Sequence, residues 1–337
     1  MTPARLHEIT SHYPRLKIAV VGDFCLDRYL EISPAHAETS IETGLPVRNV
    51  VNVRAQPGAA GTILNNLVAL GVGEIFAVGF CGDDGEGYEL RRALRALPGV
   101  DLSHFIETPS RRTFTYCKPL VIEPGQPPRE LNRLDSKNWT PTPPEITQTL
   151  AASVAALSAV CDAVIVMDQV DVAGTGVVTR EVLETLRAVA STAPRIPILA
   201  DCRRGLRGYP PCIFKMNAAE LAALSPGAAE QDAGHAAALL AAKNDRAVFI
   251  TMAERGIVAA TPDGVIAHVP ALPVRGPLDV VGAGDSVTAN LAAALAATAS
   301  PREAMELAIL ASSLVVHQLG TSGSASAEQM AQLLTAS

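Results

Sequence analysis

The second half of the chain alternates short apolar segments with stretches of helical spacing, and this alternation limits the possible folds more than any other feature. Parallel strands need crossover connections, which helices provide on both faces of a sheet. The pattern predicts an α/β fold with a doubly wound, mostly parallel sheet and helices on both faces. The expected elements are a helix over 145–160, a strand over 163–167, a helix over 176–192, strands over 197–201 and 212–216, a helix over 229–243 and a strand over 247–252.

The ends of the chain extend the same pattern. Residues 16–22 form an apolar run that ends in glycine, as expected for a buried strand, and a helical pattern over 58–71 is followed by a strand-like run over 75–79. Near the C-terminus, short strands over 257–260 and 265–269 precede two alanine-rich stretches, 282–299 and 302–319, which we expect to be long buried helices.

Two stretches do not fit the alternation. Residues 28–54 and 112–135 are polar, rich in β-branched residues and without helical periodicity. We expect them to pair as a small β-sheet outside the main core. The chain is then one domain over 1–337, with this small sheet inserted as a lid.

Charge and composition exclude several classes of protein. The net charge of -7 gives no general attraction to nucleic acid or anionic lipid, so a phosphorylated ligand must be held by local donors. The six cysteines are scattered without a Cys-x-x-Cys pair, which indicates reduced thiols in a cytoplasmic protein. Residues 1–15 lack the apolar stretch of a signal peptide, and no run of apolar residues predicts a membrane span.

The segment Gly282-Ala283-Gly284-Asp285 has the composition of an anion-binding turn. It precedes a long helix, so its backbone amides become unpaired donors at the positive end of the helix dipole. Asp285 in the first turn can accept a proton from a hydroxyl held against that anion, which is what phosphoryl transfer requires. An ordinary helix cap explains the same four residues equally well.

Polar residues follow the predicted strands at one end of the sheet. In α/β sheets ligands bind beyond the carboxyl ends of the strands. The sequence therefore predicts a binding edge there, marked by Asp23, Asp168, Asp201, Asn217 and Thr251.

Further motifs follow one another along the chain. They are Gly22-Asp23-Phe-Cys-Leu-Asp27-Arg-Tyr, Gly82-Asp83-Asp84-Gly85, Asn132-Arg133-Leu-Asp135, Lys215-Met-Asn217-Ala-Ala-Glu220, Thr251-Met-Ala-Glu254-Arg-Gly256, Asp279-Val-Val-Gly-Ala-Gly-Asp285 and Leu319-Gly320-Thr321-Ser322. In their order and composition they resemble the ribokinase (PfkB) family of carbohydrate kinases, and the segment ending at Asp285 is similar to the family signature Asp-Thr-x-Gly-Ala-Gly-Asp. The similarity runs along nearly the whole chain and is greatest to the kinase domain of the heptose 7-phosphate kinase and ADP-heptose synthase group.

This resemblance implies an ATP-dependent kinase for a sugar or sugar phosphate, with heptose 7-phosphate as one candidate acceptor. It also implies Mg²⁺, leaves a K⁺ requirement open, and suggests a homodimer formed through the lid. Asp285 would be the catalytic base, and Gly282, Ala283 and Gly284 the anion hole. The implied nucleotide-side residues are Thr251, Glu254, Gly256, Asp279 and Ser312, with Asn217 and Glu220 ordering Mg²⁺ through water, and the implied acceptor-side residues are Asp23, Asp27, Gly58, Ala59, Thr62, Asn66, Arg133 and Asp168.

The segments that the resemblance assigns to acceptor binding differ in sequence from those of the heptose group. The heptose group usually has Gly-Gly-Ala-Ala-Asn where this chain has Gly58-Ala-Ala-Gly-Thr62, and Asp-Tyr-x-Lys-Gly where this chain has Asp168-Gln-Val-Asp-Val172. A methyl group at Ala59 restricts close backbone approach, and Thr62 lacks the two-sided hydrogen bonding of an amide. Acceptor recognition is therefore expected to differ.

Alternatives remain open for single residues and for the whole chain. Asn217 and Glu220 also fit a capping box that simply starts a helix. No Walker A motif and no Gly-x-Gly-x-x-Gly is present, and the His-x-Gly-His of a nucleotidyl-transferring domain is missing, so only a kinase activity is implied. The competing functions are a sugar-binding or regulatory protein with little catalysis, and a nucleoside or vitamin-precursor kinase.

Overall fold

Strand β1 (Lys17–Gly22) lies inside the main sheet and separates two hydrophobic cores. Its side chains alternate between them: Ile18 and Val20 belong to one core, and Ala19 and Val21 to the other. A strand that is buried on both faces has a continuous apolar sequence, which is why residues 16–22 carry no polar alternation.

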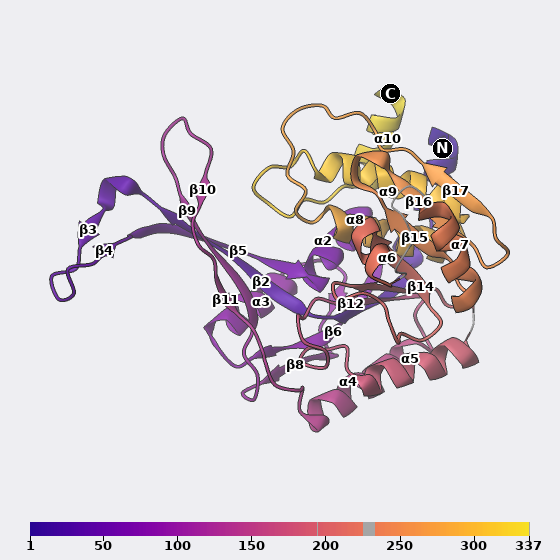
Figure 1. Cartoon of the computed structure of the whole chain (residues 1–337), viewed down its shortest axis with the longest axis horizontal. Helices are drawn as coiled ribbons and strands as arrows, with labels where there is room; N and C mark the ends of the chain where they lie inside the picture. Colours follow the sequence, from indigo (N-terminus) through magenta and orange to yellow (C-terminus); the bar gives the residue numbers. More distant parts are fainter. Residues whose placement is uncertain (194, 225–232, 337) are drawn as a thin grey trace.

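The main sheet is mostly parallel, as the alternation predicts (Figure 1). This computed structural model describes residues 1–193, 195–224 and 233–336. In spatial order its strands are β17 (Ile266–Val269), β16 (Ile257–Ala260), β15 (Val248–Thr251), β14 (Ile213–Asn217), β13 (Ile198–Cys202), β12 (Ala163–Asp168), β1, β6 (Glu74–Gly82) and β7 (Val100–Asp101), with β8 (Phe105–Thr108) beside β6. Neighbouring strands from β15 to β7 in this order run parallel, whereas β16 pairs antiparallel with both β15 and β17.

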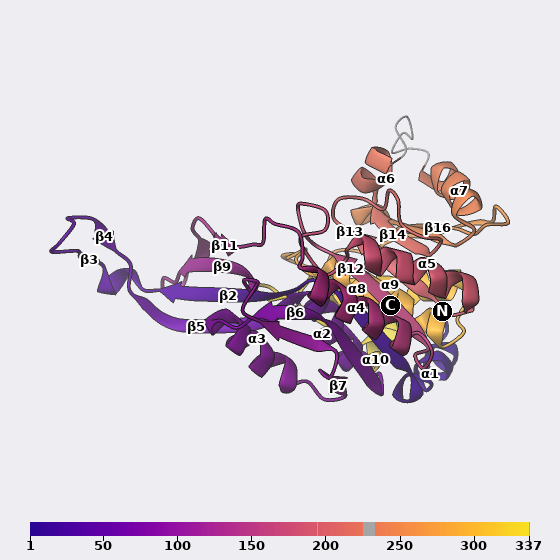
Figure 2. The same ribbon diagram turned by 90° about the horizontal axis from the view of Figure 1, so that it is seen from below.

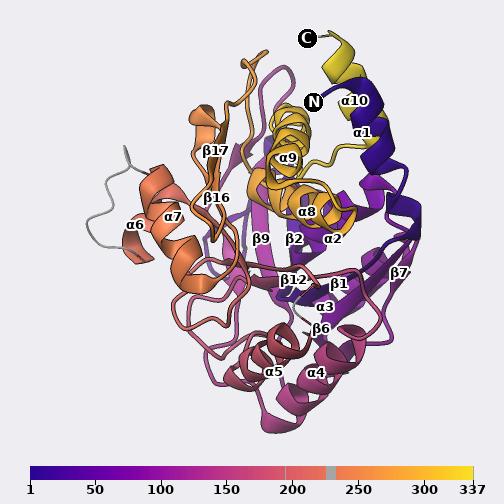
Figure 3. The ribbon, with the colours of Figure 1, turned by 90° about the vertical axis from the view of Figure 1, so that its right-hand side faces the viewer.

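Helices cover both faces of this sheet, so the predicted fold class is confirmed (Figure 3). Among the described residues, no helix is long and apolar enough to cross a membrane. One core holds residues of α1 (Pro3–Thr10), α2 (Ala60–Leu70), α3 (Gly85–Arg95), α8 (Ala283–Ala296), α9 (Pro301–Val315) and α10 (Ala327–Ala336), and the other holds residues of α4 (Pro144–Leu157), α5 (Arg180–Thr192), α6 (Ala218–Leu224) and α7 (Ala233–Asn244).

Two helices differ from the sequence pattern by four residues at one end, while those expected over 58–71, 145–160 and 282–299 differ by fewer. The helix expected over 176–192 begins at Arg180, because residues before it form a loop whose Val177 amide donates to Asp23 Oδ1. The helix expected over 302–319 ends at Val315, where the chain turns back toward Asp279. Part of the helix expected over 229–243 lies outside the described residues, and its described part is α7.

A separate small sheet projects from the main body (Figures 1 and 2). Its central strand β2 (Phe24–Ile32) pairs antiparallel with β5 (Val50–Ala59) and parallel with β9 (Phe114–Val121). Strand β5 leads directly into α2. The hairpin of β3 (Glu38–Thr39) and β4 (Pro46–Val47) lies between β2 and β5, at the end far from the main sheet. The strands of the small sheet are β10 (Arg129–Glu130), β9 (Phe114–Val121), β2 (Phe24–Ile32) and β5 (Val50–Ala59), with β11 (Leu134–Ser136) paired to β9.

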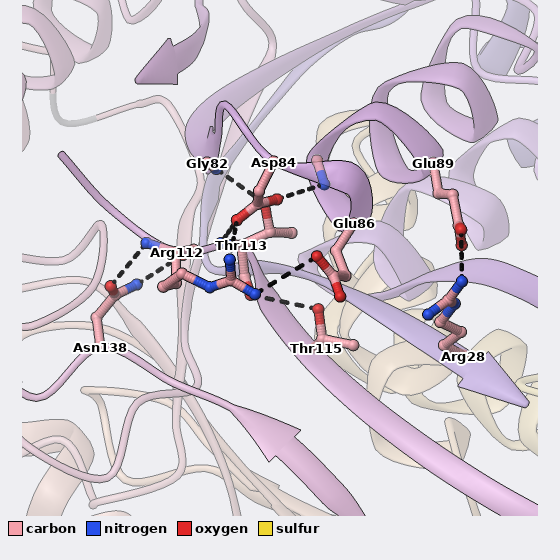
Figure 4. A network of polar contacts seen from close by, with 10 residues as sticks. Arg28, Gly82, Asp84, Glu86, Glu89, Arg112, Thr113, Thr115 and Asn138 are labelled. Carbon is pink, nitrogen blue, oxygen red and sulfur yellow. Dashed lines mark hydrogen bonds and ion pairs between the residues drawn. The ribbon is translucent and has the colours of Figure 1, made fainter. Parts of the chain in front are cut away.

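Asp84 joins the main sheet to the small sheet (Figure 4). Its carboxylate caps α3 by accepting from Gly87 N at 2.7 Å, and it also accepts from Thr113 N at 3.0 Å and Thr113 Oγ1 at 2.6 Å. The Thr113 hydroxyl in turn accepts from Gly82 N, at the end of β6, at 2.8 Å. Although burial acts in the opposite direction, these hydrogen bonds hold the pKa of Asp84 below its usual value. One side chain thus fixes the start of β9 against the end of β6.

Replacing Asp84 by alanine should lower the free energy of unfolding by about 1–2 kcal/mol, since a helix cap and the junction are lost together. Urea unfolding measures this loss, with Asp83→Ala, a change at the exposed neighbour, as the matched control. Because the folded-state pKa of Asp84 is depressed, its stabilisation is present at neutral pH and disappears as the pH falls below about 4. Equal stability of the two variants at pH 7 would contradict this role.

Candidate functional site

The N-terminus of α8 lies at the edge where the parallel strands end. Gly282 is its N-cap residue, with a left-handed φ of 81°, and Asp285 stands in the first turn. A Cβ atom on Gly282 would lie 3.3 Å from Ser322 Cβ and 3.4 Å from Thr62 Cγ2, so both the backbone and the space favour glycine. The amide of Ala283 donates to Val280 O at 3.2 Å. The remaining first-turn amides form a positive helix end suited to an anion.

A buried ion pair lies next to this turn. Lys215 Nζ lies 2.7 Å from Asp201 Oδ2, and Thr288 Oγ1 of α8 donates to the same oxygen at 3.0 Å. Burial lowers the pKa of Lys215, but the carboxylates of Asp201, Asp285 and Glu220 together raise it above its usual value, so the ammonium group stays charged. A Cβ atom on Gly284 would lie 3.2 Å from Lys215 Nζ. A fixed positive charge therefore sits directly beside the glycine turn.

Asp285 has an environment that favours its protonated form. Burial is the main cause, and the negative charges of Asp201 and Asp27 add to it, while Lys215 opposes them. Together they raise the pKa of Asp285 to about 7. A carboxyl group with this pKa is well matched to proton transfer near neutral pH.

A cavity of about 940 Å³ opens beside this turn, between the ends of β14 and β15 and the helices α8 and α9. Its volume is in the range of sites for small ligands. One part is polar and the other apolar. The predicted residues that line it are Asn217, Thr251, Glu254, Gly256, Ala283, Gly284 and Ser312, and its apolar wall includes Leu272, Val274, Leu278, Ile309 and Val316.

Asn217 and Glu220 form the capping box that the sequence allows. Glu220 N donates to Asn217 Oδ1 at 2.9 Å, and Asn217 N donates to Glu220 Oε2 at 2.8 Å, at the start of α6. Within the described residues, no group of three His, Cys, Asp or Glu side chains could hold a metal ion. Mg²⁺ usually takes one or two carboxylates together with substrate phosphates and water. Glu220 follows Ala219, which lines the cavity, so its carboxylate fits that role.

Asp27 forms the other side of the site. It is 5% exposed, and burial raises its pKa, while Lys118 and Ser322 oppose the rise. Lys118 Nζ lies 3.3 Å from its Oδ1 atom. A Cβ atom on Gly58 would lie 2.8 Å from Asp27 Oδ2, so the strand can pass the carboxylate only because residue 58 is glycine. The charge of Asp27 reaches Asp285, which places the two carboxylates at one site.

Asp23 and Asp168 make contacts within the protein itself. Asp23 Oδ1 accepts from Val177 N and Oδ2 from Gln169 N, both at 2.8 Å, which holds the loop after β12. Burial and the nearby Asp168 raise the pKa of Asp23 to about 7. Asp168 Oδ2 accepts from Arg204 Nη2 at 2.5 Å and from Tyr209 Oη at 2.8 Å. These contacts hold the loops that follow β12 and β13.

Three more predicted residues also have partners within the chain. Asn66 is fully buried in α2 and donates to Thr62 O at 2.9 Å and Gly323 O at 3.3 Å. Asp279 accepts from Val281 N and Gly320 N, each at 3.0 Å, and thereby fixes the turn before α8. The Arg133 guanidinium pairs with Asp135 at the edge of the small sheet.

The model of the pfkB family of carbohydrate kinases matches residues 16–328. The chain belongs to this family. Curated relatives of this pfkB-family chain include "Bifunctional protein HldE" of Azorhizobium caulinodans, 33% identical over 326 residues, and that of Bradyrhizobium sp., 31% identical over 333 residues. The alignments cover 94% and 97% of this chain but only 64% and 65% of those relatives.

Solved structures share the fold of this pfkB-family chain. Arabidopsis thaliana ribokinase complexed with ribose and ATP has a TM-score of 0.65 at 18% identity, with 95% of this chain and 98% of that chain covered. Escherichia coli phosphofructokinase-2 in complex with substrates and products has a TM-score of 0.71 at 16% identity, with 95% and 99% covered.

Sequence reasoning missed Lys215 as a site residue, although it lies two positions before Asn217 in the same strand. The available signal was a lysine in an otherwise apolar strand, since a buried cation needs a partner. Asp201 was expected at the sheet edge, but its ion pair with Lys215 and its hydrogen bond to Thr288 were not.

Ala59 carries backbone strain that can be tested. It precedes α2 with φ 53° and ψ -116°, a conformation that glycine adopts readily and alanine does not. Ala59→Gly should therefore raise the free energy of unfolding by about 1 kcal/mol, as relief of strain exceeds the added entropy of the unfolded chain. The matched control, Ala60→Gly in the helix itself, should lower it. Urea unfolding that shows Ala59→Gly to be destabilising would contradict the strain.

The raised pKa of Asp285 predicts a dependence of stability on pH. Between its ordinary value of 3.8 and about 7, the folded chain keeps a proton that the unfolded chain releases, so this group lowers stability as the pH rises through that window. Asp285→Asn mimics the protonated side chain and removes the effect. Thermal unfolding should show the variant to be more stable than the wild type at pH 8, with a smaller difference at pH 4. A difference independent of pH would rule out the raised pKa.

Proposed function

We propose that this chain transfers the γ-phosphoryl group of ATP to a hydroxyl group of a sugar or sugar phosphate. One observation carries the proposal: Asp285, with a pKa near 7, stands in the first turn of α8 directly after Gly284, which lines the 940 Å³ cavity and adjoins the Lys215 ammonium group. The negative charge of Asp27 also acts on Asp285. A base, an anion site and two binding regions therefore meet at one place. Phosphoryl transfer depends mainly on such positioning and charge stabilisation.

In this proposal Asp285 accepts the proton of the acceptor hydroxyl as the hydroxyl oxygen bonds to the γ-phosphorus. The bond from that phosphorus to the oxygen bridging the β- and γ-phosphates breaks, and ADP leaves. Asp27 holds neighbouring hydroxyl groups of the acceptor. The amides of Gly282 and Gly284 and Lys215 Nζ stabilise the negative charge of the moving phosphoryl group, as preorganised donors do in other enzymes, whereas the Ala283 amide already donates to Val280 O. The adjoining polar wall of the cavity, at Thr251 and Gly256, receives the remaining phosphates.

The nucleotide base fits the apolar part of the cavity, near Val274 and Ile309, with Ser312 close by. Glu220 and Asn217 would hold the waters of Mg²⁺, since the capping box engages only Oε2 of the Glu220 carboxylate. When bound, Mg²⁺ would neutralise charge on the phosphates.

The acceptor class follows from the family and from the relatives. HldE proteins and this chain share about a third of their residues over the matched region, which makes a heptose 7-phosphate one acceptor to test. We also propose that two copies associate through the small sheet and the adjoining β3–β4 hairpin. Strand β5 carries the exposed apolar side chains Val51 and Val53, and the hairpin carries Ile41 and Leu45. A K⁺ requirement has no support in the described contacts.

Two other functions are compatible with parts of the site. The altered segment Gly58–Thr62 and the internal pairing of Asp168 favour a sugar-binding or regulatory protein with little catalysis. The apolar cavity wall is also compatible with a nucleoside or vitamin-precursor kinase. The presence of Asp285 with a pKa near 7 argues for catalysis.

An acceptor screen tests the proposal directly. ADP release from Mg·ATP would be measured with heptose 7-phosphate, fructose 6-phosphate, ribose, adenosine and pyridoxal as added acceptors. We expect at least one sugar or sugar phosphate to stimulate release well above the acceptor-free rate. Stimulation by adenosine or pyridoxal alone would favour the nucleoside or vitamin-precursor kinase, and no stimulation at all would favour the binding protein.

Asp285→Asn should reduce kcat by about 10²–10⁴-fold, because general base catalysis is lost. ATP affinity, measured by calorimetry, should remain, since the amides and Lys215 are unchanged. Asp263→Asn, at an exposed turn, is the matched control and should keep the wild-type rate. Near-normal turnover of Asp285→Asn would exclude Asp285 as the base.

A further inference from the structure

Three polar side chains lie in one row across the small sheet. Asp27 of β2 stands opposite Gln56 of β5 and opposite Tyr116 of β9. Residues opposite one another in a sheet project from the same face. The other face carries Arg28, which pairs with Glu89 of α3 at 2.9 Å (Figure 4). The row therefore faces away from α3, toward the site that contains Asp285.

Both outer members of the row have a polar atom without a hydrogen bond of normal geometry. Tyr116 is 7% exposed, and its buried Oη atom makes no bond of normal length and angle in the described part of the chain. Burial raises the pKa of Tyr116 to about 12, and a weak hydrogen bond to the Gln169 side chain opposes this rise only in part. Gln56 Nε2 is buried without a partner as well.

The Gln56 amide is held in place by its other end. Thr321 Oγ1 donates to Gln56 Oε1 at 3.0 Å. A hydroxyl group can donate or accept, so either orientation of the amide leaves one polar atom unpaired. Unpaired buried polar groups normally cost about 1–3 kcal/mol each. Two such groups on either side of one carboxylate are better explained by a ligand that pairs with them.

The row is close to the reacting groups. Ser322 follows Thr321 and contacts both Asp27 and the Gly282 turn. Neighbouring strands are about 4.8 Å apart, so the three side chains extend over about 10 Å. An extended sugar of several carbons can reach all three.

We propose that Tyr116, Asp27 and Gln56 form one row of acceptor contacts that selects a polyhydroxylated sugar over an acceptor with few hydroxyl groups. The inference rests on the proposed kinase function and specifies its acceptor. Tyr116 Oη and the Gln56 amide each bind one hydroxyl group of the sugar, and Asp27 accepts from a third. Both Tyr116 and Gln56 are thus specificity-determining residues.

The test uses Tyr116→Phe and Gln56→Met, which remove the polar groups and keep the shape. Calorimetric titrations would measure the affinity for heptose 7-phosphate, fructose 6-phosphate, ribose, adenosine and pyridoxal, and for deoxy analogues of the sugar that binds best. Each variant should bind that sugar about three- to tenfold more weakly, the loss expected for one hydrogen bond. The matched controls are Tyr88→Phe, at an exposed position of α3 on the other face of the small sheet, and Gln332→Met in α10.

The deoxy analogues identify the contacts. The effect of Tyr116→Phe should vanish with a sugar that lacks one particular hydroxyl group, and the effect of Gln56→Met with a sugar that lacks a different one. Tyr116→Phe should also leave the free protein as stable as the wild type or more so, because it removes an unpaired buried hydroxyl group. A purely structural role for Tyr116 predicts a loss of stability instead, which urea unfolding would detect.

Failure of this inference can be distinguished from failure of the kinase function. The titrations would be repeated in the Asp285→Asn chain, in which sugar binding does not depend on turnover. Hydroxyl-specific losses there support the row even if no phosphoryl transfer is found. The row is overturned if the variants bind like their controls, if all deoxy analogues respond alike, if adenosine or pyridoxal binds more tightly than every sugar, or if no sugar binds.

Discussion

The ion pair between Lys215 and Asp201 is the contact on which the candidate site depends. It joins β14 to β13, and Thr288 extends it to α8. A buried charge without its partner is strongly destabilising, so the three elements are held in one arrangement. The arrangement puts the α8 N-terminus, an ammonium group and Asp285 at the same edge of the sheet. The same ion pair thus organises the fold and the electrostatics of the proposed chemistry.

The small sheet is connected to the main body at two levels. At its base, Asp84 and Thr113 tie β9 to β6 and α3 (Figure 4). Nearer the site, Thr321 holds Gln56 of β5, and Ser322 contacts Asp27 of β2. The first connection is a dense set of short hydrogen bonds, whereas the second consists of single contacts to a loop. The small sheet is therefore held firmly at its base by Asp84 and Thr113, and more weakly near the site through Gln56 and Asp27.

The sequence allowed the fold class and the α8 turn to be predicted because both depend on local patterns. Strand and helix periodicity is local, and a glycine turn before a long helix determines its own geometry. Asp23 and Asp168 were correctly predicted at the edge of the sheet where the parallel strands end. Their partners Val177 and Arg204 lie far along the chain, and no sequence pattern identifies such pairs. The helices α1 and α3 were not anticipated. Helix α1 has only eight residues, and α3 is mostly polar, although its buried residues Leu90 and Leu94 stand at helical spacing.

The close approach of Thr62, Gly282 and Ser322 has a consequence for how the protein matures. Thr62 and Gly282 are separated by more than half of the chain, yet a Cβ atom on Gly282 would lie only 3.4 Å from Thr62 Cγ2 and 3.3 Å from Ser322 Cβ. Contacts of such large sequence separation form late, because loop closure must precede them. The proposed anion-binding turn is therefore completed only when the C-terminal segment has docked onto α2, where Asn66 donates to Gly323 O. A chain still emerging from the ribosome would possess most of its sheet but no assembled site, so the proposed activity would appear only with the finished fold.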